Sequence, residues 1–294
     1  MSQPTPPTCQ TTKSEKHKPF KGKPKVAFYS LTSCEGCQFA ILDLGKRLLD
    51  LTKKIDIVQM RLIEEEIDRA KYYDIAVIEG APIEKSNFSL LKKVRRKANF
   101  LIAIGACANL GNFMRIKNWR DKEKLINYVY KCSDKLDNPD VYPIDKVVKV
   151  DYKIPGCPPN AEDFLNAISN LLEGRMPYMP KRPVCYECQK NEYECILQNY
   201  SENGGKVCLG PLVQGGCDAI CLKSKMPCWG CRGLMEGDNI RNTENLLKVI
   251  QKDHSQEEID AAMEVFGVKD DVKGRVEKNS EKDRNTKLKS QNKK

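Results

Sequence analysis

Histidine is scarce in this sequence of 294 residues, with His17 near the start and His254 near the end as its two copies. A catalytic triad built around histidine, or a metal site rich in imidazole, therefore has almost no residues to draw on. Long apolar runs are lacking too: no eighteen consecutive apolar residues occur, and residues 1–24 have no apolar stretch of the kind found in signal peptides. We therefore expect a cytoplasmic protein.

The body of the chain also has little net charge, although the whole chain carries +10. Residues 1–24 hold five lysines against one glutamate, and residues 269–294 hold ten basic against five acidic residues. Both ends are poor in apolar residues, so we expect two disordered basic tails that aid solubility, with a nucleic-acid or membrane arm as the alternative. A basic groove-reading face on the body is not expected, nor is a nucleic-acid or membrane partner.

Strand and helix patterns alternate over residues 25–180. Buried strands are predicted over residues 25–31, 55–60, 74–80, 100–104 and 147–150. Helices are predicted directly after the first strand, over 86–97 with Ser86 as the cap, over 122–130 and over 161–172. Nearly continuous apolar strands between helices favour an α/β domain whose parallel sheet is covered on both faces.

Cysteine is abundant, with 14 copies, and a reducing cytosol favours metal or redox chemistry over disulfides. Four cysteines follow predicted strands: Cys34 and Cys37 in a C-x-x-C motif, Cys107 in GAC, and Cys157 in PGCPP. The loops at the carboxyl ends of parallel strands meet in one crevice, so these sulfurs are predicted to form one four-thiolate site. Alone, the C-x-x-C motif would also fit a redox dithiol or a zinc knuckle.

Glu79 follows the third predicted strand in the sequence IEG and is expected to face the same crevice. One interpretation makes it a helix N-cap or a solvated carboxylate. The other gives it a hydrogen-bonding or proton-handling role beside the thiolates.

Residues 181–240 have a different composition, rich in Gly, Pro and Cys, and we expect a small Cys-rich domain that depends on inorganic groups to fold. Its eight cysteines suffice for two further four-thiolate sites, with zinc as the alternative to 4Fe–4S clusters. They are Cys185, Cys188, Cys195, Cys208, Cys217, Cys221, Cys228 and Cys231. Cys9 and Cys132 are left over and are expected to be unligated. Two short helices are expected over 241–268, the second beginning at a capping box from Ser255 to Glu258.

The ordered set TSCEGCQ, IEG, GAC, PGCPP, CLGP and PCWGC resembles the small subunit of NiFe hydrogenases, over about residues 25–235. Within that family the sequence is most similar to the cytoplasmic delta subunits of sulfhydrogenases and gamma subunits of methyl-viologen-reducing hydrogenases. The resemblance implies a flavodoxin-like doubly wound parallel sheet over residues 25–180 and a small ferredoxin-like iron–sulfur domain over residues 181–240.

The resemblance also implies three 4Fe–4S clusters. The proximal cluster would be held by Cys34, Cys37, Cys107 and Cys157. The distal cluster would be held by Cys185, Cys188, Cys195 and Cys208. The medial cluster would be held by Cys217, Cys221, Cys228 and Cys231. Cys185 stands where membrane-linked and periplasmic relatives have histidine, and Cys221 adds a fourth medial thiolate. Cys208 and Cys217 could exchange clusters.

The function implied is that of an oxidoreductase subunit without catalytic residues of its own. It would relay electrons between the nickel–iron site of a large subunit and a flavin- or ferredoxin-type acceptor subunit. One alternative is the cluster-bearing small subunit of a quinone-reducing or membrane-bound hydrogenase-like complex, which usually lacks the eight-cysteine extension. The other is a zinc-stabilised binding module.

Overall fold

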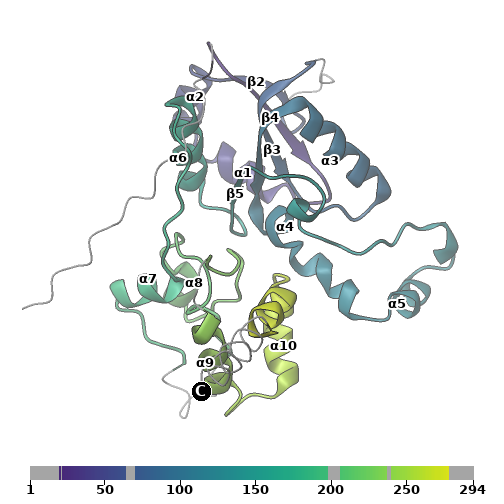
Figure 1. Ribbon diagram of the computed structural model, residues 1–294, viewed down its shortest axis with the longest axis vertical. Coiled ribbons are helices and arrows are strands. Elements are labelled where there is room, and N and C mark those ends of the chain that lie inside the picture. Colours follow the sequence, from purple (N-terminus) through teal and green to yellow (C-terminus); the bar gives the residue numbers. More distant parts are fainter. Residues whose placement is uncertain (1–19, 21, 64–69, 198–205, 237–239, 278–294) are drawn as a thin grey trace, which may run out of the picture.

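The computed structural model describes residues 20, 22–63, 70–197, 206–236 and 240–277. Its first part is a five-stranded sheet of order β2-β1-β3-β4-β5 in which all neighbouring strands are parallel (Figure 1). The strands are β1 Lys25–Ser30, β2 Asp56–Met60, β3 Tyr73–Glu79, β4 Ala98–Ile104 and β5 Tyr152–Ile154. This is the strand order of flavodoxin-like doubly wound sheets, so the predicted fold of this part is confirmed.

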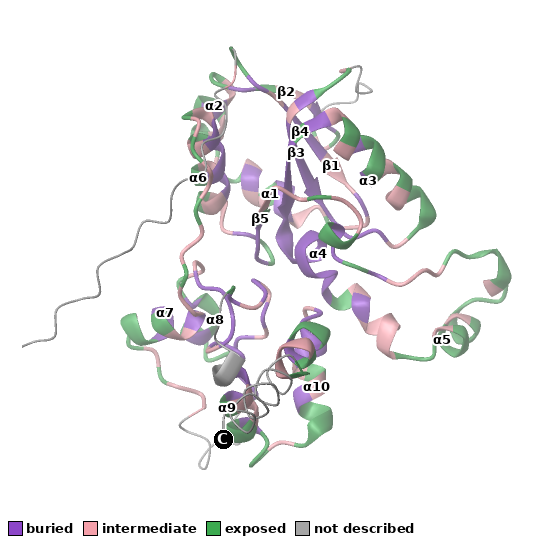
Figure 2. Cartoon of the chain, in the orientation of Figure 1, coloured by how far each residue is buried: buried purple, intermediate pink, exposed green. Residues whose placement is uncertain are grey.

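Helices cover both faces of the sheet (Figure 1). One face carries α1 Gly36–Leu42, α2 Lys46–Thr52 and α6 Ala161–Leu172, and the other carries α3 Lys85–Lys97. Successive strand residues point to opposite faces, and in β4 this sends Ile102 into one core cluster and Leu101 into the other. The central strands β3 and β4 are almost entirely buried (Figure 2).

The prediction of the fifth strand at residues 147–150 is wrong, because the strand that pairs with β4 begins at Tyr152. The side chain of Asp151 accepts a hydrogen bond from the backbone N–H of Leu101 at 2.8 Å and forms an ion pair with Arg95 at 2.5 Å. These contacts fix where pairing begins. Val147, Val148 and Val150 pack against the core without joining the ladder.

The helix after β1 is interrupted, which the sequence pattern does not predict. Gly45 adopts φ +54°, a conformation that favours glycine, and separates α1 from α2. In these two helices Phe39 and Leu49 are 52% and 65% exposed, while Ile41 and Leu51 are buried. The predicted cap of α3 is also wrong: the helix begins at Lys85, and Ser86 lies inside it.

The connection from β4 to β5 contains α4 Gly105–Leu110, the 3₁₀ helix η1 Asn112–Trp119, α5 Lys122–Val129, η2 Ser133–Lys135 and η3 Ile144–Lys146. The predicted helix at α5 is confirmed, and its N-cap Asp121 accepts the N–H of Lys124 at 3.1 Å. It has no buried residue and projects away from the sheet (Figure 2).

The Cys-rich region holds two short helices, α7 Val184–Lys190 and α8 Ile220–Lys223, and is followed by α9 Ile240–Ile250 and α10 Gln256–Glu264. These parts share one apolar core, in which Val184, Leu209 and Val213 join Ile259 and Met263 of α10. The C-terminal helices therefore complete the core that the Cys-rich region could not form alone. The capping box from Ser255 to Glu258 is confirmed.

Residues 269–277, expected in the disordered tail, are helical, and Val272 is buried. Several of their charges are paired: Lys269 binds Asp260 and Glu264, and Asp270 binds Arg115. The rest of that tail and nearly all of the N-terminal one lie outside the described residues. Within the described ranges, no helix is both long and apolar enough to span a bilayer.

Candidate metal centres

The four cysteines predicted to form the proximal site lie at the carboxyl ends of the strands. Cys34 and Cys37 follow β1, Cys107 lies in α4 directly after β4, and Cys157 follows β5. The backbone N–H of Ala106 donates to the carbonyl of Gly156 at 2.7 Å, which joins the last two of these loops. The structure therefore brings residues from three loops to one edge of the sheet.

The sulfurs of this group are close enough to influence one another. Burial raises the pKa of Cys37 far above its ordinary value, and Glu79, Cys107 and Cys157 raise it further. Burial also raises the pKa of Cys107 to about 11, an effect to which Cys157 and Cys34 add. Such mutual effects act over a few ångströms. Thiols grouped in this way release their protons when a metal supplies compensating positive charge, so the donor set fits a metal cluster.

Asn112 contributes a hydrogen-bond donor at the same place. Its Nδ2 donates to Cys107 Sγ at 3.2 Å and lies 4.0 Å from Cys157 Sγ, and it lowers the pKa that burial raises in both thiols. The residue is 3% exposed and has φ +54°. An amide donor beside sulfur stabilises thiolate, the form that binds metal.

Glu79 lies where the sequence places it and acts as the cap of α1. Its carboxylate accepts the backbone N–H of Cys37 at 3.1 Å and that of Gln38 at 3.3 Å. The residue that precedes the helix, Glu35, provides no side-chain cap. The N-cap interpretation therefore describes the contacts, and the carboxylate also fixes the backbone of a predicted ligand.

Replacing Glu79 with glutamine should destabilise the protein by about 1–3 kcal/mol, because an amide presents one acceptor oxygen where the carboxylate presents two. The matched control is Glu84→Gln, which removes an exposed carboxylate bonded to the Ser86 hydroxyl. Thermal unfolding under anaerobic conditions measures both. Equal melting temperatures for the two variants would contradict the capping role.

The predicted distal cysteines lie together around α7. The four thiols and several apolar side chains line one small cavity. These cysteines are Cys185, Cys188, Cys195 and Cys208. Burial raises the pKa of Cys185, and the other three thiols add to the rise. Ile196 and Leu222 are among the apolar residues that close the cavity.

The predicted medial cysteines form a third group. Burial raises the pKa of Cys231 to about 12, with Cys217 and Cys221 adding to it. The pKa of Cys228 is also raised by burial, and Cys208, Cys231 and Cys217 add to the rise. Cys208 lines the distal cavity and also acts on Cys228, while Cys217 acts on Cys231 and Cys228. The role of each as a ligand stays a prediction.

The three groups are in contact in a fixed order. The backbone N–H of Cys157 lowers the pKa of Cys231, which links the first group to the medial one. The backbone N–H of Cys228 donates to Cys208 Sγ at 3.4 Å, which links the medial group to the distal one. The medial group therefore lies between the other two.

The remaining two cysteines are not predicted to be ligands. Cys132 is exposed, and Cys9 lies outside the described residues.

A single zinc ion needs donors about 2.3 Å from one centre. No set of three Cys, His, Asp or Glu side chains in the described ranges has that arrangement. Thiolates that each bind a different iron atom of one cluster do not need to converge on a point.

Three functional candidates were missed by the sequence reasoning: Asn112, Glu187 and Arg232. Glu187 lies inside the C-Y-E-C motif and Arg232 directly follows C-W-G-C. Both are charged yet 2% and 4% exposed, and this burial is the property that singles them out. Their positions inside and beside the motifs were the available signal.

Comparison with known proteins gives a family match over residues 34–171, to the family described as NADH ubiquinone oxidoreductase, 20 Kd subunit. The chain is similar to Sulfhydrogenase 2 subunit delta of Pyrococcus furiosus, with 33% identity over 82% of this chain and 98% of the relative. It is also similar to a vhu subunit of the F420-non-reducing hydrogenase of Methanocaldococcus jannaschii, with 31% identity over 71% of this chain and 81% of the relative.

A solved structure is similar over about half of the chain. It is a crystal structure of an NAD+-reducing NiFe hydrogenase in the H2-reduced state, and the match covers 54% of this chain and 96% of the other. The TM-score is 0.48 and the sequence identity is 33%.

Proposed function

The chain belongs to the family of hydrogenase subunits that includes the delta subunit of sulfhydrogenase and this vhu subunit of F420-non-reducing hydrogenase, and we propose that it is the electron-transfer subunit of a cytoplasmic NiFe hydrogenase. As a member of this family it is an oxidoreductase subunit, and the catalytic metal site belongs to a separate large subunit. The observation that supports the proposal best is the ordered contact of three four-cysteine groups.

Each group would hold one 4Fe–4S cluster, with the proximal, medial and distal ligands as assigned by the resemblance. When bound, such clusters supply one-electron transfer over a range of potentials set by their surroundings. The chain's own contribution is to bury and orient the thiolates. Asn112 donates to one thiol, and Glu79 fixes the backbone of another.

The exposure of individual cysteines suggests where partners bind. Cys34 and Cys157 of the proximal group are exposed. The nickel–iron subunit would bind over them, because electrons must enter or leave there. The acceptor subunit, of flavin or ferredoxin type, would bind near the distal group, because that group comes last in the order of contacts from the proximal one.

The two alternative functions, a quinone-reducing or membrane-bound complex and a zinc-stabilised binding module, require different metal sites. A quinone-reducing or membrane-bound complex would not need the second and third groups of cysteines. A zinc-stabilised binding module would need single-ion sites.

Metal analysis after anaerobic purification tests the proposal. We expect about twelve iron atoms per chain with a matching amount of sulfide, since three clusters contain four irons each. The protein should co-purify with a large subunit that carries paired C-x-x-C motifs. A colourless protein with about three zinc ions would instead support the binding module, and about four irons would support the single-cluster alternative.

A further inference from the structure

A short loop between the distal and medial cysteines lies between two buried side chains of opposite charge. On one side, the carboxylate of Glu187 accepts the backbone N–H of Gly216 at 2.7 Å and of Cys217 at 3.1 Å. On the other side, Arg232 Nε donates to the carbonyl of Gly215 at 3.0 Å. Residues 215–217 are thus fixed from both sides.

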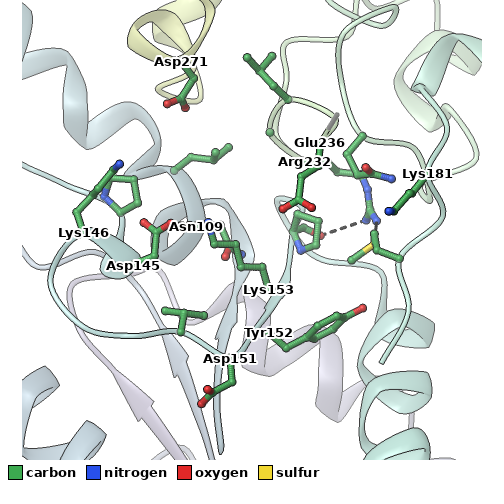
Figure 3. A pocket seen from close by; sticks show the side chains of 18 of the residues that line it. Asn109, Asp145, Lys146, Asp151, Tyr152, Lys153, Lys181, Arg232, Glu236 and Asp271 are labelled. Carbon is green, nitrogen blue, oxygen red and sulfur yellow. Dashed lines mark hydrogen bonds and ion pairs between the residues drawn. The ribbon is translucent and has the colours of Figure 1, made fainter. Parts of the chain in front are cut away.

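Arg232 extends from this loop to the sheet domain. Its Nη1 donates to the carbonyl of Pro155 at 3.1 Å, two residues before Cys157. Its Nη2 pairs with Asp163 of α6 at 2.9 Å, and the side chain is 1% exposed. Figure 3 shows Arg232 on the wall of the cavity between the two parts of the chain. One guanidinium therefore connects the medial group, the loop of the proximal group and α6.

The glycines of the loop are required by this contact. Gly216 has φ +113°, and a Cβ there would lie 2.5 Å from Arg232 Nη2. A Cβ on Gly215 would lie 3.1 Å from Glu187 Oε1. Because neither glycine has a Cβ, the side chains of Glu187 and Arg232 can approach the backbone closely from both sides.

The electrostatic consequence follows from burial. A charge buried among protein atoms acts more strongly than one in water, because the surrounding dielectric constant is lower. Arg232 directly follows Cys231 and bonds to the carbonyl of Gly215, two residues before Cys217, so its charge lies beside two predicted ligands of the medial cluster. Reduction adds negative charge to a metal cluster, so a nearby buried cation favours the reduced form.

We propose that Arg232 is a positioning residue that fixes the medial site against the proximal loop and raises the reduction potential of the medial cluster. This inference rests on the proposed function. The guanidinium orders the loop through Gly215 and Pro155, and its charge tunes the site whose ligand Cys231 precedes it. Glu187 acts on the same loop with the opposite sign.

The test uses the assembled hydrogenase carrying Arg232→Gln, Arg232→Lys or Glu187→Gln. The control is Arg47→Gln, which removes an exposed arginine paired with Glu162, the neighbour of Asp163 on α6. Redox titration followed by electron paramagnetic resonance gives the midpoint potential of each cluster, and iron analysis shows whether each variant keeps its clusters.

In Arg232→Gln we expect the ratio of reduced to oxidised medial cluster at a fixed potential to fall about tenfold, which is about 59 mV for one electron. Arg232→Lys keeps the charge and should restore most of that shift. Glu187→Gln should move the potential upwards, and Arg47→Gln should not move it.

The outcomes separate this inference from the function that it rests on. A wild-type protein without three cluster signals would overturn the proposed function. Three wild-type signals with unchanged potentials in Arg232→Gln and Glu187→Gln would overturn the role of Arg232 alone. If Arg232→Gln does not assemble, the other two variants test the inference. A higher medial potential in Glu187→Gln, together with a near-native potential in Arg232→Lys, supports it. An unchanged medial potential in Glu187→Gln rejects it.

Discussion

The variant Gly105→Ala is expected to lose the proximal site, with about four of the roughly twelve irons missing. A Cβ on Gly105 would overlap Cys37 Sγ, and the residue has φ +84°. The left-handed backbone alone costs an alanine about 1–2 kcal/mol. The sulfur cannot move aside without leaving its group, because Glu79 holds the backbone of Cys37.

Gly22→Ala is the matched control for this variant. Gly22 has φ +81°, and nothing lies within 4 Å of the position that its Cβ would occupy. It therefore has the same backbone cost without the overlap. Iron content and cluster spectra after anaerobic purification measure both variants, and a full iron complement in Gly105→Ala would show that the sulfur positions are not those of the structure.

The variant Cys34→Ser is expected to abolish hydrogen-dependent dye reduction, with a loss of at least about a hundredfold, while the medial and distal cluster signals remain. The reason is that a hydroxyl is a poor substitute for a thiolate ligand of iron, and the affected group is the one proposed to face the nickel–iron subunit. Activity and spectra of the assembled enzyme give the two readouts.

Cys132→Ser is the control for this change, because Cys132 is exposed and lies outside the three groups. It should retain full activity and all three cluster signals. If Cys34→Ser kept normal activity, the assignment of the proximal site would be wrong. If it lost all three signals, the groups would not be independent sites.

Much of the first site could be predicted from sequence because it depends on topology. Parallel strands bring their carboxyl ends to one edge, so Cys34, Cys107 and Cys157 are predicted to converge once the strands are located. The prediction misplaces strand β5 by a few residues, yet Cys157 still lies in the loop that follows this strand. A local error of this size does not change which edge the loop reaches.

The buried charges could not be predicted in the same way. Arg232 and Asp163 are 69 residues apart, and nothing in a periodic pattern indicates that they meet. The charged composition of residues 269–277 predicts a tail. The structure shows that these charges have partners on η1 and α10, which only the tertiary fold brings near.

The shared apolar core also has a consequence for biosynthesis. All the cysteines of the distal and medial groups precede α10 in the chain, so they leave the ribosome before Ile259 and Met263, which complete their core. Until those residues emerge, the region has no closed interior. The distal and medial cysteines therefore become enclosed only after the last helices have been synthesised.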